Sequence, residues 1–389
     1  MSSYPVLHLR QEQRPYEHRA FSPDVVGKLV AAGYPVHVER SSTDPSYERI
    51  FKDQEYSDAG AKLVDTHTWT DADKGTLILG LKELPEEDFP LKNDHIQFSH
   101  CYKDQGGWEK VLGRFPRGGS TLYDLEFLVD EQGRRVSAFG YHAGFAGAAL
   151  ALKVWAWQLT HPASEPLPSV ENFTSGRGYY LNEEELVQQI REDVAAGEKV
   201  AGRKPHAMIL GALGRCGRGA ADMFKRAGLT DENLTKWDLN ETKDKQGPYK
   251  EIVDSDIFLN AIYLSDPIPP FVNQETLSSP DRKLTVVCDV SCDTSNPHNP
   301  IPIYNTLTTF TKPTLPVKVP SSELPLSVIA IDHLPSMMPR EASDAFSQGL
   351  LESLLTLKDR DSAPVWKRAE DLFKKHVSRL PPGLQKKEV

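Results

Sequence analysis

The chain has 389 residues, of which 39% are hydrophobic and 26% charged, and its formal net charge is −10. This length suits two hydrophobic cores better than one. The acidic balance, without any dense basic stretch, argues against a protein that binds nucleic acid, and the longest apolar stretch, residues 143–152, is far too short to span a membrane.

Short apolar runs alternate with helical patterns along most of the chain, which predicts an α/β fold with parallel-rich sheets flanked by helices. Ser22 and Pro23 signal the start of a first helix, and Gly33 signals its end. The expected strands are 6–9, 36–39, 76–81, 95–98, 207–210, 236–239, 257–262, 284–290 and 326–331. Further helices are expected at 143–160, from Asn182 to about 196, and from about 340 and 365; loops are expected at 41–56, 161–178 and 313–325.

The stretch "HAMILGALGRCGRGAADMF" has the pattern of a dinucleotide-binding turn. A strand runs into Gly211, Gly214 and Gly217, which allow a tight turn and close approach of backbone N–H groups to a pyrophosphate. Asp238 ends the next strand, where an acidic side chain can accept hydrogen bonds from ribose hydroxyls and repel a 2′-phosphate. NAD is therefore expected rather than NADP. The alternative is that the glycines only permit close packing and that Asp238 caps a helix.

Two neighbouring strands each deliver a proton-transfer side chain at the carboxyl end. Lys82 and Glu83 follow the apolar run 76–81, and His100 follows the run 95–98. A lysine and a histidine so placed suit general acid–base catalysis. The alternative is a solvated lysine at a strand end and a loop histidine with a structural role.

Several motifs together resemble one enzyme family. In chain order they are "GLKELPE", "HIQFSHCYKDQ", "TLYDLEFL", "GRRVSAFG", "GFAGAAL", "GALGRCG", "KWD", "NPHNPIPIY" and "IDHLPSMMPREAS". They resemble the NAD-dependent, lysine-forming saccharopine dehydrogenases of fungal lysine biosynthesis. The resemblance implies two Rossmann-like domains with the active site in the cleft between them. The substrate domain is expected at 1–138 plus 331–389, and the NAD domain at 139–330.

The resemblance also implies a reaction and roles for the charged residues. Saccharopine is cleaved oxidatively to lysine and 2-oxoglutarate, with Lys82 as the base for the secondary amine and His100 as the acid/base for imine hydrolysis. Because lysine ordinarily has a pKa near ~10.4, Lys82 would need desolvation or neighbouring positive charge to act as a base. Glu83 and Glu126 would moderate that shift.

Three carboxylates on the substrate require cationic anchors. The family's motif positions imply substrate binding by Arg19, Gln105, Arg135 and Phe139, and cofactor contacts by Arg134, Gly214, Arg215, Asp238, Thr242, Tyr263, Val290, Ile331, Asp332, His333 and Leu334. Each arginine could instead be a surface ion-pair partner, and Asp332 and His333 could form a structural turn before Pro335.

The chain also departs from the family. Cys216 matches a cysteine that can pair with another in relatives, but Ala261 stands at the partner position, so no disulfide is expected. The four cysteines have no paired metal spacing, and no metal is expected. The N-terminus lacks the apolar core of a signal peptide and the tail reads "QKKEV", so a cytoplasmic monomer is expected. The rival interpretations are an alanine-dehydrogenase-like enzyme and an inactive NAD sensor.

Overall fold

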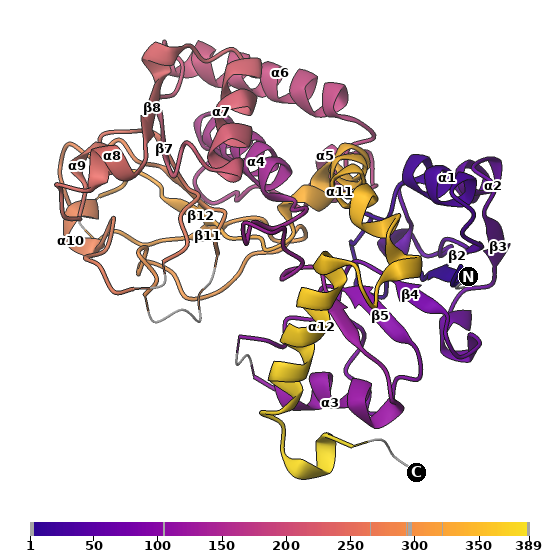
Figure 1. The fold of residues 1–389 in the computed structure, drawn as a ribbon. Helices are drawn as coiled ribbons and strands as arrows, with labels where there is room; N and C mark the ends of the chain where they lie inside the picture. The colour runs from indigo at the N-terminus through magenta and orange to yellow at the C-terminus, as the bar shows by residue number, and fades with distance from the viewer. Residues whose placement is uncertain are drawn as a thin grey trace. The chain divides into compact units, whose positions relative to one another are not determined.

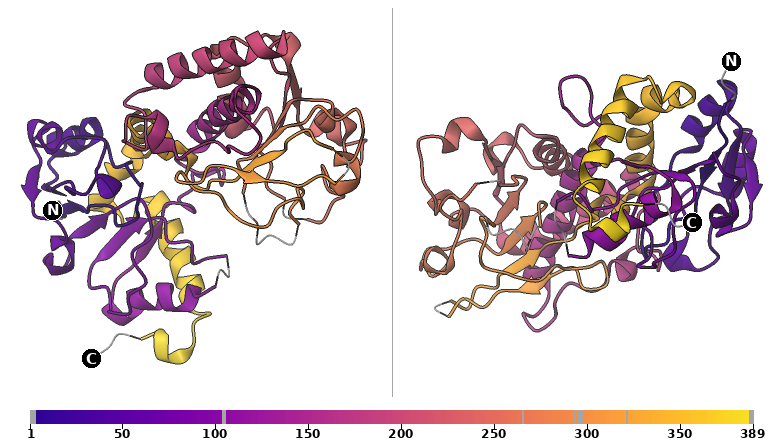
Figure 2. Two further views of the ribbon diagram at one scale, coloured as in Figure 1. Left: turned by 180° about the vertical axis from the view of Figure 1, so that it is seen from behind. Right: turned by 60° about the horizontal axis from the view of Figure 1, so that its bottom comes forward.

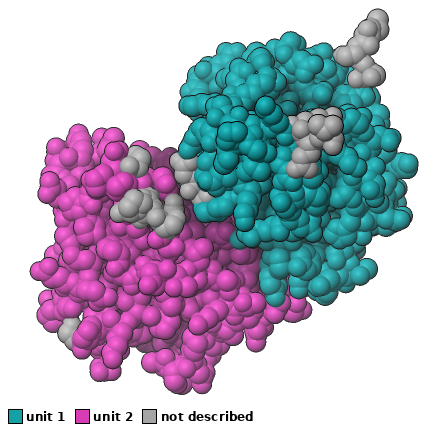
Figure 3. All heavy atoms as spheres, turned by 90° about the horizontal axis from the view of Figure 1, so that it is seen from below, with its two compact units in different colours: residues 1–138, 339–389 teal, residues 139–338 magenta. Residues whose placement is uncertain are grey.

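The computed structural model describes residues 4–103, 106–264, 266–292, 294, 298–320 and 322–386. The chain divides into two compact units, shown in different colours in Figure 3. Unit 1 combines Met1–Ala138 with Pro339–Val389, and unit 2 is the continuous segment Phe139–Met338. Each unit has its own sheet, helices and hydrophobic core.

Unit 1 is built on a six-stranded sheet in the order β3-β2-β1-β4-β5-β6, and all neighbouring strands are parallel. Its strands are β1 (Leu7–Leu9), β2 (Val36–Glu39), β3 (Lys62–Val64), β4 (Leu77–Leu79), β5 (Asp94–Gln97) and β6 (Leu122–Asp124). β1 and β4 are neighbours although two strands separate them in sequence. Ligands of open α/β sheets bind beyond the carboxyl ends of strands at such a switch in order.

Helices from both ends of the chain cover this sheet (Figure 1). They are α1 (Pro23–Ala31), α2 (Asp53–Asp58), α3 (Trp108–Gly118), α11 (Pro339–Leu354) and α12 (Pro364–Val377). α1 contacts α11, and α12 contacts both β6 and α3. The carboxyl-terminal segment therefore completes the core of the unit that the amino-terminal segment begins, as the burial of Trp366 at 0% exposure shows.

Unit 2 has a second six-stranded sheet, in the order β11-β12-β10-β9-β7-β8. Its strands are β7 (Ala207–Leu210), β8 (Leu234–Trp237), β9 (Ile257–Asn260), β10 (Val286–Asp289), β11 (Leu315–Pro316) and β12 (Ser327–Ile329). Only the pair β11–β12 is antiparallel. The order reverses at β7, which pairs with β8 on one side and β9 on the other, so β7 and β9 flank the switch point.

The long helix α4 (Gly140–Thr160) lies at the centre of unit 2, where it contacts β9, β10 and β12 of the sheet and the helices α6 (Glu183–Ala201) and α7 (Arg215–Arg226). Figure 2 shows the three helices together on one face of the sheet. Glycines allow this close packing: a Cβ on Gly144 would lie 1.8 Å from the carbonyl oxygen of Cys216, and one on Gly219 would lie 1.9 Å from that of Tyr141. The short helices of unit 2 are α5 (Val170–Phe173), α8 (Leu239–Thr242), α9 (Lys250–Val253) and α10 (Gln274–Leu277).

Most strand and helix ends differ by a few residues from those expected, and three differences matter most. Residues 331–338 belong to unit 2 rather than to the first domain, because Leu334 is buried against α4 and Tyr180 N donates to Met337 O at 2.8 Å. β8 begins two residues earlier than predicted and ends before Asp238, since this residue caps α8 and Leu239 is 71% exposed. The expected loop 41–56 contains a 3₁₀ turn, Pro45–Tyr47, and the start of α2.

Within the described ranges, every helix is too short or too polar to span a lipid bilayer. The cysteines at 101, 216, 288 and 292, all among the described residues, are not joined by disulfides. Cys101 and Cys288 are buried, and burial raises the pKa of both thiols, so neither favours the reactive thiolate form.

Candidate active site

The carboxyl end of β4 carries Lys82 at the switch point of the unit 1 sheet. Lys82 is only 7% exposed, and its backbone N–H donates to Glu12 Oε2 at 3.0 Å. Its carbonyl oxygen accepts a hydrogen bond from the Arg10 guanidinium. The backbone on both sides of Lys82 is therefore held by buried charged groups that follow β1.

His100 follows the neighbouring strand β5 and has a positive φ of 51°. Desolvation by the atoms around its ring lowers the pKa of His100, even though the residue reaches solvent. The charges of Lys82 and Arg14 lower this pKa further, whereas those of Glu83 and Glu126 raise it. The predicted proton-transfer residues thus lie close enough to influence one another, and His100 is set toward its neutral form.

The two predicted tuning carboxylates, Glu83 and Glu126, both act on the pKa of His100 through their charges. Burial would raise the pKa of Glu83, but the charges of Lys82, His100 and Arg14 lower it; Arg14 Nη1 lies 3.0 Å from Glu83 Oε1. The pKa of Glu126 is likewise lowered against the effect of burial by Lys103 and Arg135. Both glutamates are therefore held as carboxylates beside the histidine.

The predicted substrate anchors differ in the contacts that their side chains already make with neighbouring carboxylates. Arg135 has a side chain that is 43% exposed and donates to Glu126 Oε1 at 2.9 Å. Arg19 is 4% exposed, and its Nε and Nη2 each lie 2.7 Å from a Glu17 carboxylate oxygen. Gln105 lies outside the described residues.

Phe139 is the remaining predicted substrate contact, and the adjacent Arg134 is a predicted cofactor contact. Arg134 is 72% exposed and pairs with Asp130. Phe139 directly precedes α4 and belongs to unit 2.

Unit 2 has the predicted glycine turn after β7. Gly211 has a φ of +89°, a conformation that favours glycine, and a Cβ on Gly217 would lie 2.2 Å from Gly211 O. Gly214 is the N-cap of α7, and Leu213, Gly214 and Arg215 are exposed. An accessible helix N-terminus at a switch point is suited to a pyrophosphate.

Asp238 stands directly after β8, caps the next helix and contacts the glycine turn. Its Oδ1 caps α8 by accepting from Leu239 N at 2.9 Å, and its Oδ2 accepts from Leu213 N at 2.9 Å. Thr242 Oγ1 donates to Asp238 O at 3.0 Å. Because Asp238 remains partly exposed, its carboxylate can also meet a ribose placed beside the glycine turn.

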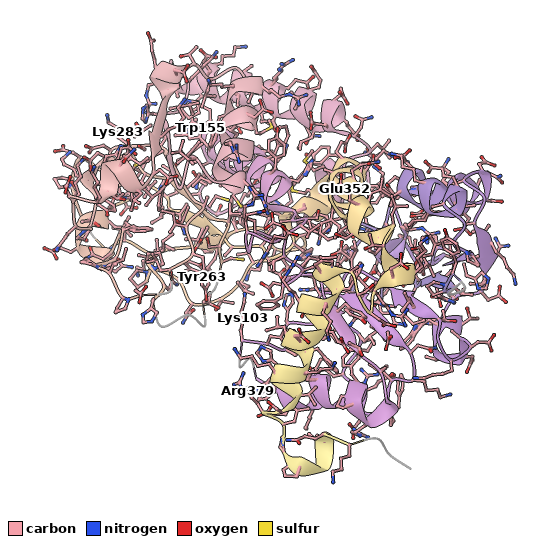
Figure 4. All side chains as sticks on the ribbon, viewed as in Figure 1. Lys103, Trp155, Tyr263, Lys283, Glu352 and Arg379 are labelled. Atoms are coloured by element: carbon pink, nitrogen blue, oxygen red, sulfur yellow. The ribbon has the colours of Figure 1, made fainter. Side chains whose placement is uncertain are left out.

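The remaining predicted cofactor residues also lie in unit 2. Tyr263, labelled in Figure 4, is 58% exposed on the loop after β9, and Val290 follows β10. Ile331 and Leu334 are each 1% exposed, so these side chains belong to the core and only their backbone could face a ligand. Asp332 Oδ1 lies 2.6 Å from His333 Nδ1.

No group of three or more His, Cys, Asp or Glu side chains among the described residues is arranged to hold a metal ion. A hollow of about 890 Å³ lies in unit 1 and is lined by residues that follow β1, β2, β3 and β4, among them Gln11, Arg40 and His67. Neither Lys82 nor His100 lines this hollow, so we assign it no role in proton transfer.

Comparisons with known proteins decide between the interpretations. Residues 8–146 match the family "Alanine dehydrogenase/PNT, N-terminal domain". The NAD⁺-dependent, L-lysine-forming saccharopine dehydrogenase of Neurospora crassa is 59% identical over 97% of both chains. That of Yarrowia lipolytica is 56% identical over 96% of this chain and 98% of its own.

The chain belongs to the NAD-dependent, lysine-forming saccharopine dehydrogenases.

Solved structures support the fold of this saccharopine dehydrogenase family member. An L-alanine dehydrogenase aligns with a TM-score of 0.60 over 97% of this chain and 98% of its own, at 20% identity. A transhydrogenase from Sinorhizobium meliloti also aligns with a TM-score of 0.60, at 17% identity over 94% and 97% of the two chains. At these identities the likeness establishes the Rossmann-like α/β fold alone.

Sequence reasoning missed several charged partners of the saccharopine dehydrogenase site. Arg14 and Lys103 pair with the two tuning glutamates, and Lys103, labelled in Figure 4, is on the loop after β5. Arg10 and Glu12 directly follow the apolar run of β1. A position directly after an apolar run is also the signal that identified Lys82 and His100. Asp124 ends β6 within the quoted motif "TLYDLEFL". A search extended to the end of the predicted first strand would have found Arg10 and Glu12, whereas Asp124 ends a strand that the sequence did not predict.

Proposed function

We propose that this chain cleaves saccharopine with NAD to L-lysine and 2-oxoglutarate, the final step of lysine biosynthesis. Unit 1 would supply the proton-transfer and carboxylate-binding groups, and unit 2 the NAD site. The observation that carries the proposal is the convergence of Lys82, Glu83, His100 and Glu126 in a member of this family.

Lys82 is proposed as the base that prepares the substrate. The secondary amine of saccharopine is an ammonium in neutral water, and its carbon can lose hydride only when the nitrogen lone pair is free. A neutral Lys82 Nζ takes this proton. NAD, when bound, supplies the hydride acceptor. Burial of Lys82 at 7% exposure, in a turn fixed through its backbone, holds the amine at a defined place.

His100 is proposed as the acid/base for the second half of the reaction. Water adds to the substrate imine, and the carbinolamine collapses by breaking the carbon–nitrogen bond. The water must lose a proton and the departing lysine nitrogen must gain one, so a single imidazole can serve both transfers. The lowered pKa of His100 keeps the ring neutral and able to accept the first proton.

Carboxylate recognition is proposed to rest first on Arg135. Its guanidinium is partly exposed, and the planar fork suits a bidentate carboxylate. Arg19 is proposed as a second anchor, although Glu17 already takes two of its nitrogens. Gln105 and Phe139 remain proposed substrate contacts, and Arg134 a proposed cofactor contact.

The cofactor proposal places the pyrophosphate at Gly214 and Arg215 and the adenosine ribose at Asp238 and Thr242. These four residues are partly or fully exposed, so a bound cofactor could reach them. Ile331 and Leu334 are buried and could contribute only backbone groups. Tyr263 and Val290 follow neighbouring strands at the same edge, and Asp332 and His333 complete the proposed set. Unit 1 is proposed as the substrate domain and unit 2 as the NAD domain.

The direct test mixes the purified chain with lysine, 2-oxoglutarate and NADH and follows the loss of NADH absorbance. We expect NADH consumption only when both lysine and 2-oxoglutarate are present, because both are needed to form the imine. Equal consumption with pyruvate and ammonia would favour the alanine-dehydrogenase interpretation. Binding of NADH without turnover of any amino acid would favour the inactive sensor.

We also propose a monomeric protein of the cytoplasm. Light scattering would test the first statement, and fluorescence microscopy of a tagged chain would test the second. A dimer at working concentrations, or an organellar signal, would contradict them.

A further inference from the structure

Two charged residues are buried directly beyond β1, where an apolar core would be expected. The Arg10 side chain is 0% exposed and the Glu12 side chain 6% exposed, and Arg10 Nη1 lies 3.3 Å from Glu12 Oε2. Glu12 accepts hydrogen bonds from the backbone N–H groups of Leu81, at 2.6 Å, and Lys82, at 3.0 Å. The carboxylate therefore fixes the backbone that carries the proposed base.

Arg10 links this turn to the next strand. Its Nη2 donates to the carbonyl oxygen of Lys82 and, at 3.4 Å, to Gln97 Oε1 at the end of β5. Gly80 makes room for the guanidinium, because a Cβ there would lie 2.4 Å from Arg10 Cζ. One arginine thus ties together the carboxyl ends of three adjacent strands.

The connection continues beneath His100 to β6. Gln97 Nε2 donates to Ser99 Oγ at 3.0 Å. The buried carboxylate of Asp124 accepts from Ser99 N at 3.3 Å through Oδ2 and from Glu126 N at 2.9 Å through Oδ1. Ser99, which directly precedes His100, and Glu126 are therefore held by the same carboxylate.

We propose that Glu12, Arg10, Gln97, Ser99 and Asp124 form a positioning network that fixes Lys82, His100 and Glu126 relative to one another. We call it the strand-end network. None of its members is proposed to touch substrate or cofactor. The inference rests on the proposed roles of Lys82 and His100, and it adds residues that act only through them.

Stability alone does not explain why charges occupy this place. Burial raises the pKa of Glu12, whereas Arg10 and the two backbone N–H groups lower it. Much of the attraction between Arg10 and Glu12 therefore only offsets the cost of removing the Glu12 carboxylate from water. A buried ion pair can often be replaced by apolar side chains without loss of stability. Burial similarly raises the pKa of Asp124 to about 7. What these groups supply, and apolar ones could not, is directional bonding to the backbone of each catalytic turn.

The test compares Arg10→Lys, Glu12→Gln and Gln97→Met with Arg282→Lys in the full chain. Lysine keeps the charge of Arg10 but not its fork, and Gln97→Met breaks the link between the strands without changing any charge. Arg282 is a matched control, because it is a 5% exposed arginine that also donates to backbone carbonyl groups, those of Leu284 and Leu324. It lies in unit 2, at the amino end of β10 rather than at a carboxyl end. Thermal unfolding, NADH dissociation constants, kcat, KM and the pH profile are measured for each.

We expect all three network variants to lower kcat, by about 10- to 100-fold where a catalytic group moves by about 1 Å. NADH affinity should be unchanged, and the ionisations in the pH profile should shift. Arg282→Lys should lower the unfolding temperature without changing kcat or the profile. If Glu12→Gln or Arg10→Lys fails to fold, Gln97→Met decides the question, because it leaves the buried ion pair intact.

The network proposal is overturned if the folded variants keep the wild-type kcat and pH profile while only their unfolding temperatures fall. It is also overturned if Arg282→Lys lowers kcat as strongly as they do. Failure of the proposed function would look different, since the wild-type chain itself would then not consume NADH with lysine and 2-oxoglutarate.

Discussion

At the scale of single residues, the site depends on opposing effects on a few titratable groups. Desolvation, Lys82 and Arg14 lower the pKa of His100, and the carboxylates Glu83 and Glu126 raise it. Because both influences act together, removing one charge should shift the pKa of His100 in a direction fixed by the sign of that charge.

This balance predicts the effect of Glu83→Gln. The substitution removes a negative charge that favours the imidazolium, so the pKa of His100 should fall further below its ordinary value. NMR titration of the His100 ring would measure the shift. Asp88→Asn is the control, because Asp88 is 80% exposed and pairs with Arg117. A rise in the pKa of His100 in Glu83→Gln would contradict the charge balance described here.

Removing the proton-transfer groups themselves should be strongly non-additive. Lys82→Met and His100→Gln should each slow turnover by about 10²–10⁴-fold, the usual scale of general acid–base catalysis. The double variant should lose far less than the product of the two effects, since both groups act in one sequence of proton transfers.

The pH profile distinguishes the base from a bystander. Wild-type saccharopine oxidation should fall at low pH, where the bases and the substrate amine are protonated. Lys82→Met should lose one ionisation and keep that of the substrate amine. A profile of unchanged shape with a rate loss of only a few-fold would show that Lys82 is not the base.

At the scale of secondary-structure elements, Asp238 combines a helix cap with a contact to the glycine turn. Asp238→Ala should weaken NADH binding and relax discrimination against NADPH, because both the ribose acceptor and its negative charge are lost. Asp238→Asn keeps an oxygen for Leu213 N and should preserve the turn while still relaxing discrimination. Fluorescence titration with both cofactors measures the outcome. Unchanged affinities in Asp238→Ala would make this residue purely structural.

The packing of α4 on α7 gives an independent prediction. Gly144→Ala would place a Cβ 1.8 Å from Cys216 O, so the helices must separate. We expect a loss of about 1–3 kcal/mol in the free energy of unfolding, the usual range for overpacking. Urea unfolding measures it, with Gly383→Ala as the control because no atom lies within 4 Å of the added Cβ. Equal stability of both variants would show that the contact can relax freely.

The sequence predicted the elements that carry strong local signals. β2 and β7 have the expected bounds, and Ser22, Pro23 and Asn182 mark helix starts as predicted. The strands β3 and β6 were missed, because charged residues interrupt their apolar runs, whereas the equally short β1, β4 and β12 lie within longer apolar runs. Asp238 was predicted as a strand end with a helix cap as the alternative, and the structure ends β8 at Trp237 and places Asp238 at the N-cap of α8.

The residues of the candidate site were also predicted only in part. Strand-end position identified Lys82 and His100, and family motifs supplied Glu83, Glu126 and the arginines. The pairing of Glu126 with Lys103, and the engagement of Arg19 by Glu17, arise from side-chain geometry. The first contact joins loops that follow different strands, so no local pattern reveals it. The second joins residues two positions apart, where the sequence alone does not fix the side-chain conformations.

At the scale of the whole molecule, the two units differ in how the chain builds them. Unit 1 needs two segments that are far apart in sequence, since α11 and α12 come from the carboxyl-terminal end. Unit 2 is continuous, and its core includes Met208, Phe258 and Val287 from three adjacent strands. One unit can therefore be excised without cutting its core, and the other cannot.

This asymmetry predicts that residues 139–338, expressed alone, fold and bind NADH. The fragment contains the complete sheet of unit 2, the helices α4 to α10 and every residue from Gly214 to Leu334 that is proposed to contact the cofactor. Circular dichroism should show native-like helix content, and fluorescence titration should show NADH binding, weakened only by the loss of the proposed Arg134 contact. Residues 1–138 alone should remain unfolded, because they lack α12, whose Trp366 is fully buried in unit 1. A fragment 139–338 that folds but does not bind NADH would place the cofactor site on groups outside unit 2.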